Sequence, residues 1–418
     1  MVIIYCLNIT IAIVLYFSFS LLATKTLRLK IANPFTIYAI ILFPVFLLEN
    51  ILAPLFYGAD FALNEYYNEA LFIYNIYSFT GILSIIFFYL VFNTVFKKSE
   101  ISFNHVISKG KLKRISNITL ILFVALFVLL SSTSEIGISG WLMNPRDGYQ
   151  NYREGNGFLY AFSLSTLSVS YFTRALALRS EMKLFICAIS YCVLVFFLGS
   201  KTFILSFAIF YLAVLSLNQS KFLKFGLILV TPLAACAILY NLFLAIGNMN
   251  VDVVLSYFDQ YQNSIYLLQD LDKGVVRLFN GTVYFSQFWS YIPRSLFPEK
   301  PFVYGFLHVN EIYYPGAAES GHTPAFSKGM DNFVDYGYVG LVILTFLTPM
   351  NIFYGYIFAK LKVFNKNVMT NSASYLLLSL ILISPSFGTY FTGPAYVLLL
   401  IFFMILFVLI ERITLRGR

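Results

Sequence analysis

Arginine side chains occur among aromatic, glycine and proline residues in two short segments of the chain. The first segment covers residues 144–155 and contains Arg146, Tyr149, Tyr152 and Arg153. The second covers residues 291–301 and contains Pro293, Arg294, Pro298, Glu299 and Lys300. Guanidinium groups bind phosphate through paired hydrogen bonds, and aromatic faces suit sugar rings. Both segments therefore predict a ligand that carries phosphate and sugar, although each arginine could instead pair with a neighbouring carboxylate.

Residues 321–340 bring a histidine and two carboxylates to the start of a predicted membrane helix. Asp331 and Asp335 follow His322 and are four residues apart, so they would share one face of a helix. An imidazole and a carboxylate are groups that a general-base step can use. The alternatives are an ordinary loop histidine and two acids favoured by the dipole of a helix N-terminus.

Two charged residues are expected at the outer part of the membrane. Glu49 lies inside an apolar run, so it is either a functional intramembrane carboxylate or an anchor for an external arginine. Lys201 stands at the outer end of a tight helical hairpin, where it is either a further anion contact or a snorkelling lysine.

Several catalytic and cofactor motifs are missing from the sequence. It contains no Walker-type phosphate loop, no GxGxxG after a strand, no HExxH and no GxSxG. The three histidines are too widely spread for a zinc site, and the four cysteines lie in apolar runs without a CxxC pair. We therefore expect no metal, no cofactor and no disulfide.

The composition indicates the class of protein that must position these residues. Apolar residues make up 59% of the chain and charged residues 11%, and the mean hydropathy is +0.79. Soluble domains contain about 25% charged residues. The chain is therefore predicted to be an all-α polytopic membrane protein. Apolar runs of spanning length predict about 11 transmembrane helices, near residues 3–23, 35–57, 70–95, 117–133, 158–178, 184–199, 201–217, 225–247, 338–359, 368–391 and 394–411.

The distribution of charge predicts the orientation of these helices. Most of the 28 Lys and Arg residues fall in alternate connections and in the carboxyl-terminal tail. Basic residues favour the cytoplasm, so the amino terminus is expected outside and the carboxyl terminus inside. This orientation explains the net charge of +9 without a nucleic-acid partner. Three parts follow, namely residues 1–247 with helices 1–8 and a short external loop (134–157), a large external loop (248–337), and residues 338–418 with helices 9–11 and a basic cytoplasmic tail.

The large external loop is expected to be partly helical. Val254, Phe258, Tyr261, Ile265 and Leu268 recur at helical spacing and predict one apolar face. That face could lie on the outer membrane surface or pack against the helix bundle. A second helix is predicted from Val275 to about Tyr291, ending before Pro293.

These motifs resemble the O-antigen polymerase family, the oligosaccharide repeat-unit polymerases of bacterial surface polysaccharides. The resemblance lies in the Arg146 segment, in the Pro-Arg-Ser run at residues 293–295 and in residues 321–340. The last segment is also similar to the O-antigen ligases, whose acid-x-Gly-x-x-Gly pattern matches residues 335–340. The span layout extends the resemblance over the whole chain.

The resemblance implies a glycosyltransferase of the bacterial inner membrane that acts on its periplasmic face. Donor and acceptor would be oligosaccharides linked to undecaprenyl diphosphate, which is the leaving group, with a chain-length regulator protein as a further partner. Arg294 is expected to bind the diphosphate, helped by Arg146, Arg153, Arg277, Lys201 and Lys300. His322 or Asp331 is expected to be the base, with Asp335 next, and Glu49, Tyr149, Tyr152 and Glu299 in supporting roles. A ligase or a flippase for the lipid-linked unit is the alternative.

Overall fold

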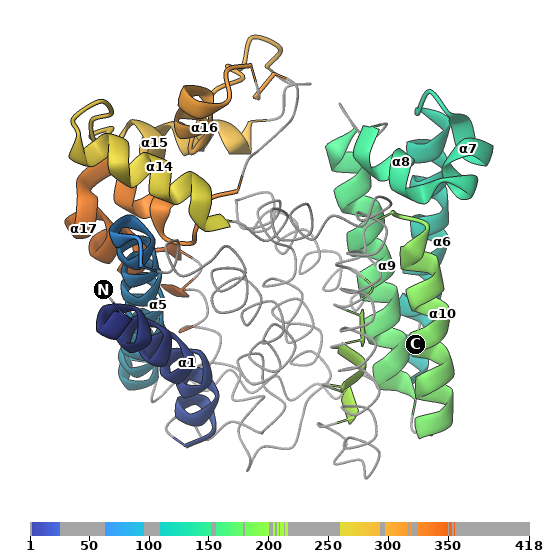
Figure 1. The fold of residues 1–418 in the computed structure, drawn as a ribbon. Coiled ribbons are helices and arrows are strands. Elements are labelled where there is room, and N and C mark those ends of the chain that lie inside the picture. The colour runs from blue at the N-terminus through green and yellow to red at the C-terminus, as the bar shows by residue number, and fades with distance from the viewer. Residues whose placement is uncertain are drawn as a thin grey trace. The chain divides into compact units, whose positions relative to one another are not determined.

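The computed structural model describes the following parts of the chain. The described residues are 2–25, 63–95, 109–151, 156–178, 180–199, several positions within 204–215, 260–292, 297–316, 318–319, 325–349, 351–352 and 355. Their regular elements are helices, and these residues contain no strand (Figure 1). The predicted helical class is thus confirmed for the described part of the chain.

The chain divides into two compact units. The first contains α1 (Val2–Lys25), α5 (Glu65–Val95), α14 (Gln260–Asp272), α15 (Thr282–Ser286), the 3-10 helix η2 (Gln287–Tyr291), α16 (Leu307–Tyr313) and α17 (Met330–Phe346). The second contains α6 (Lys109–Ser132), α7 (Gly137–Met143), α8 (Pro145–Asn151), α9 (Gly157–Ala177) and α10 (Glu181–Phe196).

Five predicted membrane helices coincide with observed ones. The predictions at 3–23, 70–95, 117–133, 158–178 and 184–199 correspond to α1, α5, α6, α9 and α10. Of these, α5 and α6 are long and apolar enough to cross a membrane. The spans predicted at 35–57, 225–247, 368–391 and 394–411 lie outside the described residues, and those at 201–217 and 338–359 are described in part. The number of spans therefore stays a prediction.

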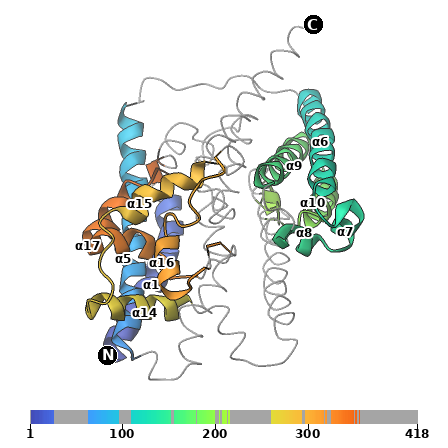
Figure 2. The same cartoon turned by 90° about the horizontal axis from the view of Figure 1, so that it is seen from above.

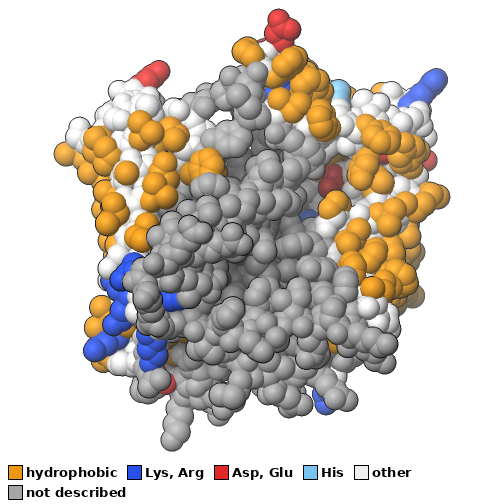
Figure 3. All heavy atoms as spheres, turned by 180° about the vertical axis from the view of Figure 1, so that it is seen from behind, with side chains coloured by type: hydrophobic (Ala, Val, Ile, Leu, Met, Phe, Trp, Pro, Cys, Tyr) orange, Lys and Arg blue, Asp and Glu red, His pale blue; other side chains and the backbone are white. Residues whose placement is uncertain are grey.

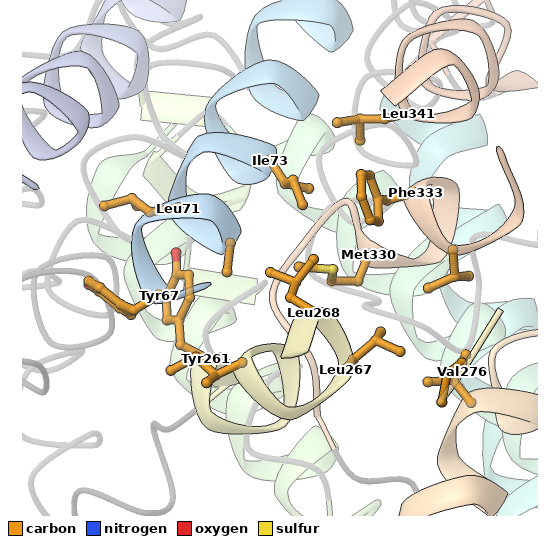
Figure 4. Close-up of a cluster of buried hydrophobic side chains, with 14 of the residues drawn as sticks. Tyr67, Leu71, Ile73, Tyr261, Leu267, Leu268, Val276, Met330, Phe333 and Leu341 are labelled. Carbon is orange, nitrogen blue, oxygen red and sulfur yellow. The ribbon is translucent and has the colours of Figure 1, made fainter. Parts of the chain in front are cut away.

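The apolar core of the first unit lies where α14 and α17 pack against α5. Tyr261, Ile265 and Leu268 are buried against this core, together with Tyr67 and Leu71 of α5 (Figure 4). Burying a large apolar side chain stabilises a fold by about 1.5–3 kcal/mol. The described part of the apolar face of α14 is therefore packed against other helices and does not lie on the membrane surface.

Polar side chains join α1 to α5. The Asn8 side-chain amide donates to the Asn68 carbonyl at 3.1 Å, and the Asn75 amide donates to the Asn8 carbonyl at 3.1 Å. All three asparagines are buried. Hydrogen bonds of this kind between apolar helices help to fix which residues of the two helices face each other.

In the second unit, α9 packs against both α6 and α10 (Figure 2). Small side chains allow close packing, because the Ser170 hydroxyl lies 2.6 Å from the Tyr191 hydroxyl and donates to the Ser116 carbonyl at 2.7 Å. Ser116, Ser170 and Tyr191 are buried, and their hydrogen bonds are made with one another inside the unit, as is usual for buried polar groups.

Candidate functional site

Helix α8, which carries Arg146, is held firmly on the end of α10. Trp141 of α7 is fully buried, and its indole N–H donates to the Phe197 carbonyl at 2.9 Å. A Cβ at Gly148 would lie 2.5 Å from Trp141 Cδ2, and a Cβ at Gly199 would lie against the Pro145 carbonyl oxygen. Only glycine fits at both contacts. The turn that precedes Lys201 is therefore packed directly against the start of α8.

Arg146 and Tyr149 lie on this helix as a pair. The Arg146 guanidinium is exposed and sits over the Tyr149 ring, 5.5 Å from its centroid. The Tyr149 ring in turn packs on Tyr160 of α9, with centroids 5.4 Å apart. The predicted segment thus presents a cation on an aromatic platform that is itself supported by α9.

Asp335 is placed at a break in α17. The backbone leaves the helical region at Tyr336 (φ −137°, ψ 20°) and Gly337 (φ 61°, ψ −144°). The Asp335 side chain is fully buried. Its Oδ1 accepts from the Gly281 and Val283 N–H groups at 2.9 and 3.1 Å, and its Oδ2 accepts from the Tyr284 N–H at 2.6 Å. This carboxylate therefore caps α15.

The break in α17 also binds the chain just before α15. The Val334 carbonyl accepts from the Phe279 N–H at 3.0 Å, and the Asp335 carbonyl accepts from the Asn280 N–H at 3.1 Å. Asn280 and Gly281 have positive φ values of 50° and 93°. The helix predicted from Val275 therefore begins only at Thr282, which corrects that prediction, because this left-handed pair turns the chain toward Asp335.

Asp331 faces different surroundings from Asp335, although the two residues are four apart. Its side chain is exposed, whereas that of Asp335 is buried. Desolvation raises the pKa of the Asp331 carboxyl, and hydrogen bonds from the backbone N–H groups of Asn332 and Asp331 offset part of this rise. A carboxylate with a raised pKa is a better proton acceptor than an ordinary one.

Helix α14 anchors the segment that leads into Asp331. The Asn263 amide donates to the Ala325 carbonyl at 2.8 Å, and the Ser264 hydroxyl accepts from the Ser327 N–H at 2.9 Å. The same helix holds α16, because the Tyr313 hydroxyl donates to Asp270 at 2.9 Å. The residues on both sides of the segment that contains His322 are thus attached to one helix.

Two separate aromatic contacts are formed by residues that lie before and after Arg294 in the sequence, and one of them involves a buried cation. The Trp289 and Phe297 rings lie 5.5 Å apart. Lys300 is 8% exposed, and its Nζ lies over the Tyr304 ring, 4.3 Å from the centroid. Glu299 is exposed. Lys300 therefore lies inside the fold, with its ammonium group on the Tyr304 ring.

Arg277 and His308 lie on either side of α15 in the sequence. Arg277 is exposed. His308 is half-buried, desolvation lowers its pKa, and the negative charge of Asp335 offsets part of this effect. The Gly305 N–H, one turn before His308, donates to the Ser286 hydroxyl of α15 at 2.8 Å. Sequence reasoning did not select His308, since its relation to Asp335 arises only from the tertiary fold.

Six predicted site residues lie outside the described part of the chain. These residues are Glu49, Tyr152, Arg153, Lys201, Arg294 and His322. Before His322 in the sequence, the Glu311 carboxylate accepts from the Gly316 and Ala318 N–H groups at 2.8 and 2.9 Å, and these bonds lower its pKa. Glu311 therefore closes the turn that precedes the His322 segment.

The chain is similar to two curated proteins, both named O-antigen polymerase. One is from Salmonella typhimurium (strain LT2) and the other from Salmonella typhi. Each is 27% identical over 369 residues, which cover 85% of this chain and 84% of the relative. No family model and no solved structure matches the chain. The resemblance predicted from the arginine and aspartate segments is thus confirmed by homologues that cover most of the sequence.

Proposed function

We propose that this protein is a membrane glycosyltransferase that polymerises lipid-linked oligosaccharide repeat units into O-antigen or a similar surface polysaccharide. The similarity to O-antigen polymerases across most of the chain is the observation that carries the proposal. The apolar helices α5 and α6 agree with a place in the membrane. The remaining details extend the proposal beyond that similarity. They are about 11 spans, an external amino terminus, a periplasmic loop at 248–337 and a location in the inner membrane.

In the proposed reaction, a hydroxyl of one undecaprenyl-diphosphate-linked repeat unit attacks the anomeric carbon of the growing chain. A new glycosidic C–O bond forms while the bond between that carbon and the diphosphate oxygen breaks. The hydroxyl proton passes to a base, and undecaprenyl diphosphate leaves with the electron pair. The enzyme must therefore supply one proton acceptor and several cations. A chain-length regulator would act on this step as a separate partner.

The described contacts favour Asp331 over Asp335 as the base. Asp331 is exposed, its pKa is raised, and α14 anchors the segment before it. Asp335 already accepts three backbone N–H groups and is buried, so we assign it a positioning role. His322 is the other proposed base.

The proposed diphosphate ligands differ in what their surroundings allow. Arg294 is the central ligand, supported by Arg153 and Lys201. Arg146 and Arg277 are exposed and available to an anion. Lys300 is buried on the Tyr304 ring, so its proposed contribution is a fixed positive charge six residues after Arg294 in the sequence. Tyr149 supports Arg146, while Glu49, Tyr152 and Glu299 keep supporting roles.

The first experiment is a gel of lipopolysaccharide from a strain that lacks this gene, with the wild-type gene restored as the control. Collapse of the ladder to core plus one repeat unit supports a polymerase. Loss of all O-antigen would indicate a ligase or a flippase instead, and accumulation of lipid-linked polymer on the outer face would then identify the ligase. An unchanged ladder would contradict all three functions for this polysaccharide.

A second experiment tests the central arginine. Loss of one preorganised charge contact typically costs about 100- to 1000-fold in rate. Arg294→Ala and Arg294→Lys should both prevent chain formation at equal protein level, because lysine cannot bind diphosphate with two parallel bonds. Lys109→Ala, a change at the start of α6, is the matched loss of a cation and should leave the ladder intact. Near-normal chains from Arg294→Ala would refute the assignment.

A further inference from the structure

An apolar and basic surface lies on residues 273–288, outside the proposed catalytic residues except for Arg277. We call it the interfacial segment. Its exposed apolar side chains are Val275 (72% exposed), Leu278 (38%), Tyr284 (43%), Phe285 (70%) and Phe288 (58%). Lys273 and Arg277 are exposed beside them. A soluble surface rarely gathers large apolar side chains in this way.

The segment already has an inner face that serves the core. Val276 and Val283 are 8% and 3% exposed and belong to the core cluster of the first unit. The neighbouring Val275 and Phe285 point away from that core, since most of their surface is exposed. The exposed apolar side chains are therefore not part of the core of the first unit. They would be stabilised by contact with an apolar surface outside this unit.

The outer face continues onto helices that are suited to a membrane. Leu278 Cδ1 lies 3.9 Å from the position that a Cβ would occupy at Gly337 of α17. At the next residue, the Tyr338 ring lies 6.2 Å from the Phe72 ring of α5, and the Tyr338 hydroxyl donates to Glu69 at 3.0 Å. Helix α5 is long and apolar enough to cross a membrane.

The exposed side chains of these helices are of the same kind. On α5 and α17 they include Phe72, Phe79, Leu83, Phe87, Tyr336, Tyr338, Val339 and Val342. Apolar side chains gather over large parts of the described surface (Figure 3). An exposed apolar face therefore runs from a membrane-length helix through α17 to the interfacial segment.

We propose that the interfacial segment is embedded in the headgroup zone of the outer leaflet of the membrane. Its apolar side chains would enter the acyl boundary, while Lys273 and Arg277 contact anionic lipid headgroups. Tyrosines such as Tyr284, Tyr336 and Tyr338 suit that zone, because their rings are apolar and their hydroxyls are polar. A lipid surface explains both the cations and the aromatic residues, whereas a second copy of the chain would need a complementary acidic surface.

This inference adds a reason for the position of Arg277. If the function proposed above holds, the diphosphate of the lipid-linked substrate lies at headgroup depth. A segment embedded at that depth would present the Arg277 guanidinium to the diphosphate as the substrate diffuses in the leaflet. The embedding itself rests only on the exposed surface and its continuity with α17, so it can be tested without any enzymatic assay.

The experiment is spin-label accessibility on the full chain in nanodiscs of phosphatidylethanolamine and phosphatidylglycerol. Cys6, Cys187, Cys192 and Cys236 are replaced by serine, and single cysteines are introduced as Val275→Cys or Phe285→Cys. Ile312→Cys is the matched control, because Ile312 is 45% exposed on α16 beside the acidic Glu311. Collision of the label with oxygen reports lipid, and collision with a water-soluble nickel complex reports water.

The labels at 275 and 285 should collide with oxygen several-fold more often than the label at 312, and with nickel several-fold less often. Nickel collision equal to that at 312 would overturn the proposal. Exclusion of both reagents from 275 and 285 would also overturn it, in favour of a protein partner or a second copy.

A second measurement tests the cations separately. Lys273→Gln with Arg277→Gln should raise nickel collision at 275, and replacing phosphatidylglycerol by phosphatidylcholine should act in the same direction. An unchanged signal in both cases would overturn the headgroup contact. Embedded labels on a chain that makes no polymer would contradict only the proposed function, and water-facing labels on an active chain would contradict only this inference.

Discussion

Removal of the Asp335 carboxylate is expected to release the start of α15 rather than to remove a proton acceptor. The carboxylate accepts three backbone N–H groups, and two of these bonds are buried. A hydrogen bond to a charged group contributes about 1.5–3 kcal/mol, and a buried donor left without a partner costs a similar amount. The three bonds share one acceptor and do not add fully, so about 3 kcal/mol is a conservative value for Asp335→Ala.

Hydrogen exchange measures this loss at the amides that make the bonds. A change of 1.36 kcal/mol corresponds to a factor of ten. About 3 kcal/mol should therefore lower the protection of the Gly281, Val283 and Tyr284 amides on the order of 100-fold. Asp335→Asn should give an intermediate loss, because one amide oxygen can still accept while the amide N–H₂ faces a donor. Exchange is followed by mass spectrometry of peptides from residues 279–288 in the intact protein.

Asp331→Asn is the matched control for this experiment. Asp331 lies one helical turn earlier and is exposed, so its loss should leave protection of residues 279–288 unchanged. One result would refute the positioning role of Asp335. That result is full protection of these amides in Asp335→Ala together with complete loss of polymer.

Three further predictions concern single residues of the site. Asp331→Asn should lower polymer formation on the order of 100-fold or more, and since desolvation raises the Asp331 pKa, the acid limb of in vitro activity should lie above the ordinary carboxyl value of about 3.9. A limb at the ordinary value would argue against Asp331 as the base. Because the His308 pKa is lowered by folding, the folded state binds fewer protons, so α16 should lose stability as pH falls below about 6.5. His308→Gln should remove that dependence in hydrogen exchange of α16, and an unaltered pH profile would contradict it. Gly148→Ala would place a methyl group 2.5 Å from Trp141 Cδ2 and should destabilise the α8 contact by about 1–3 kcal/mol, measured as a lower melting temperature, whereas Gly157→Ala meets nothing within 4 Å and serves as the control.

Five of the described helices could be predicted because their signal is local. Runs of apolar residues bounded by charges gave α1, α5, α6, α9 and α10 to within a few residues at most ends, although α6 begins at Lys109, eight residues before its predicted start. That early turn is basic and carries Leu112 and Ile115 inward, so helical spacing rather than hydropathy marks it.

The structure of residues 275–308 was harder to predict. The apolar content of residues 275–291 indicates a helix, but the Asn280–Gly281 pair is a turn signal that apolar content outweighed. His308 carried no signal at all, since its relation to Asp335 depends on the bond between Gly305 and Ser286. Charge–charge proximity across separate elements cannot be read from spacing along the chain.

The acid-x-Gly-x-x-Gly pattern at residues 335–340 has a structural explanation that does not require chemistry. Asp335 caps α15, and Gly337 adopts a left-handed conformation that side chains rarely tolerate. A Cβ at Gly340 would lie 2.8 Å from the Asn332 carbonyl oxygen, so the second glycine allows α17 to pack closely across its own break.

Each member of the pattern therefore builds the joint that connects α17 to α15. Because this role is structural, we expect the pattern to be compatible with either a polymerase or a ligase. Whether the enzyme acts as a polymerase or a ligase must then depend on other residues, which the joint between α17 and α15 holds in place. Among the described residues we propose Asp331 and Arg277 for this role, because both are exposed, whereas the Asp335 carboxylate already accepts three backbone N–H groups.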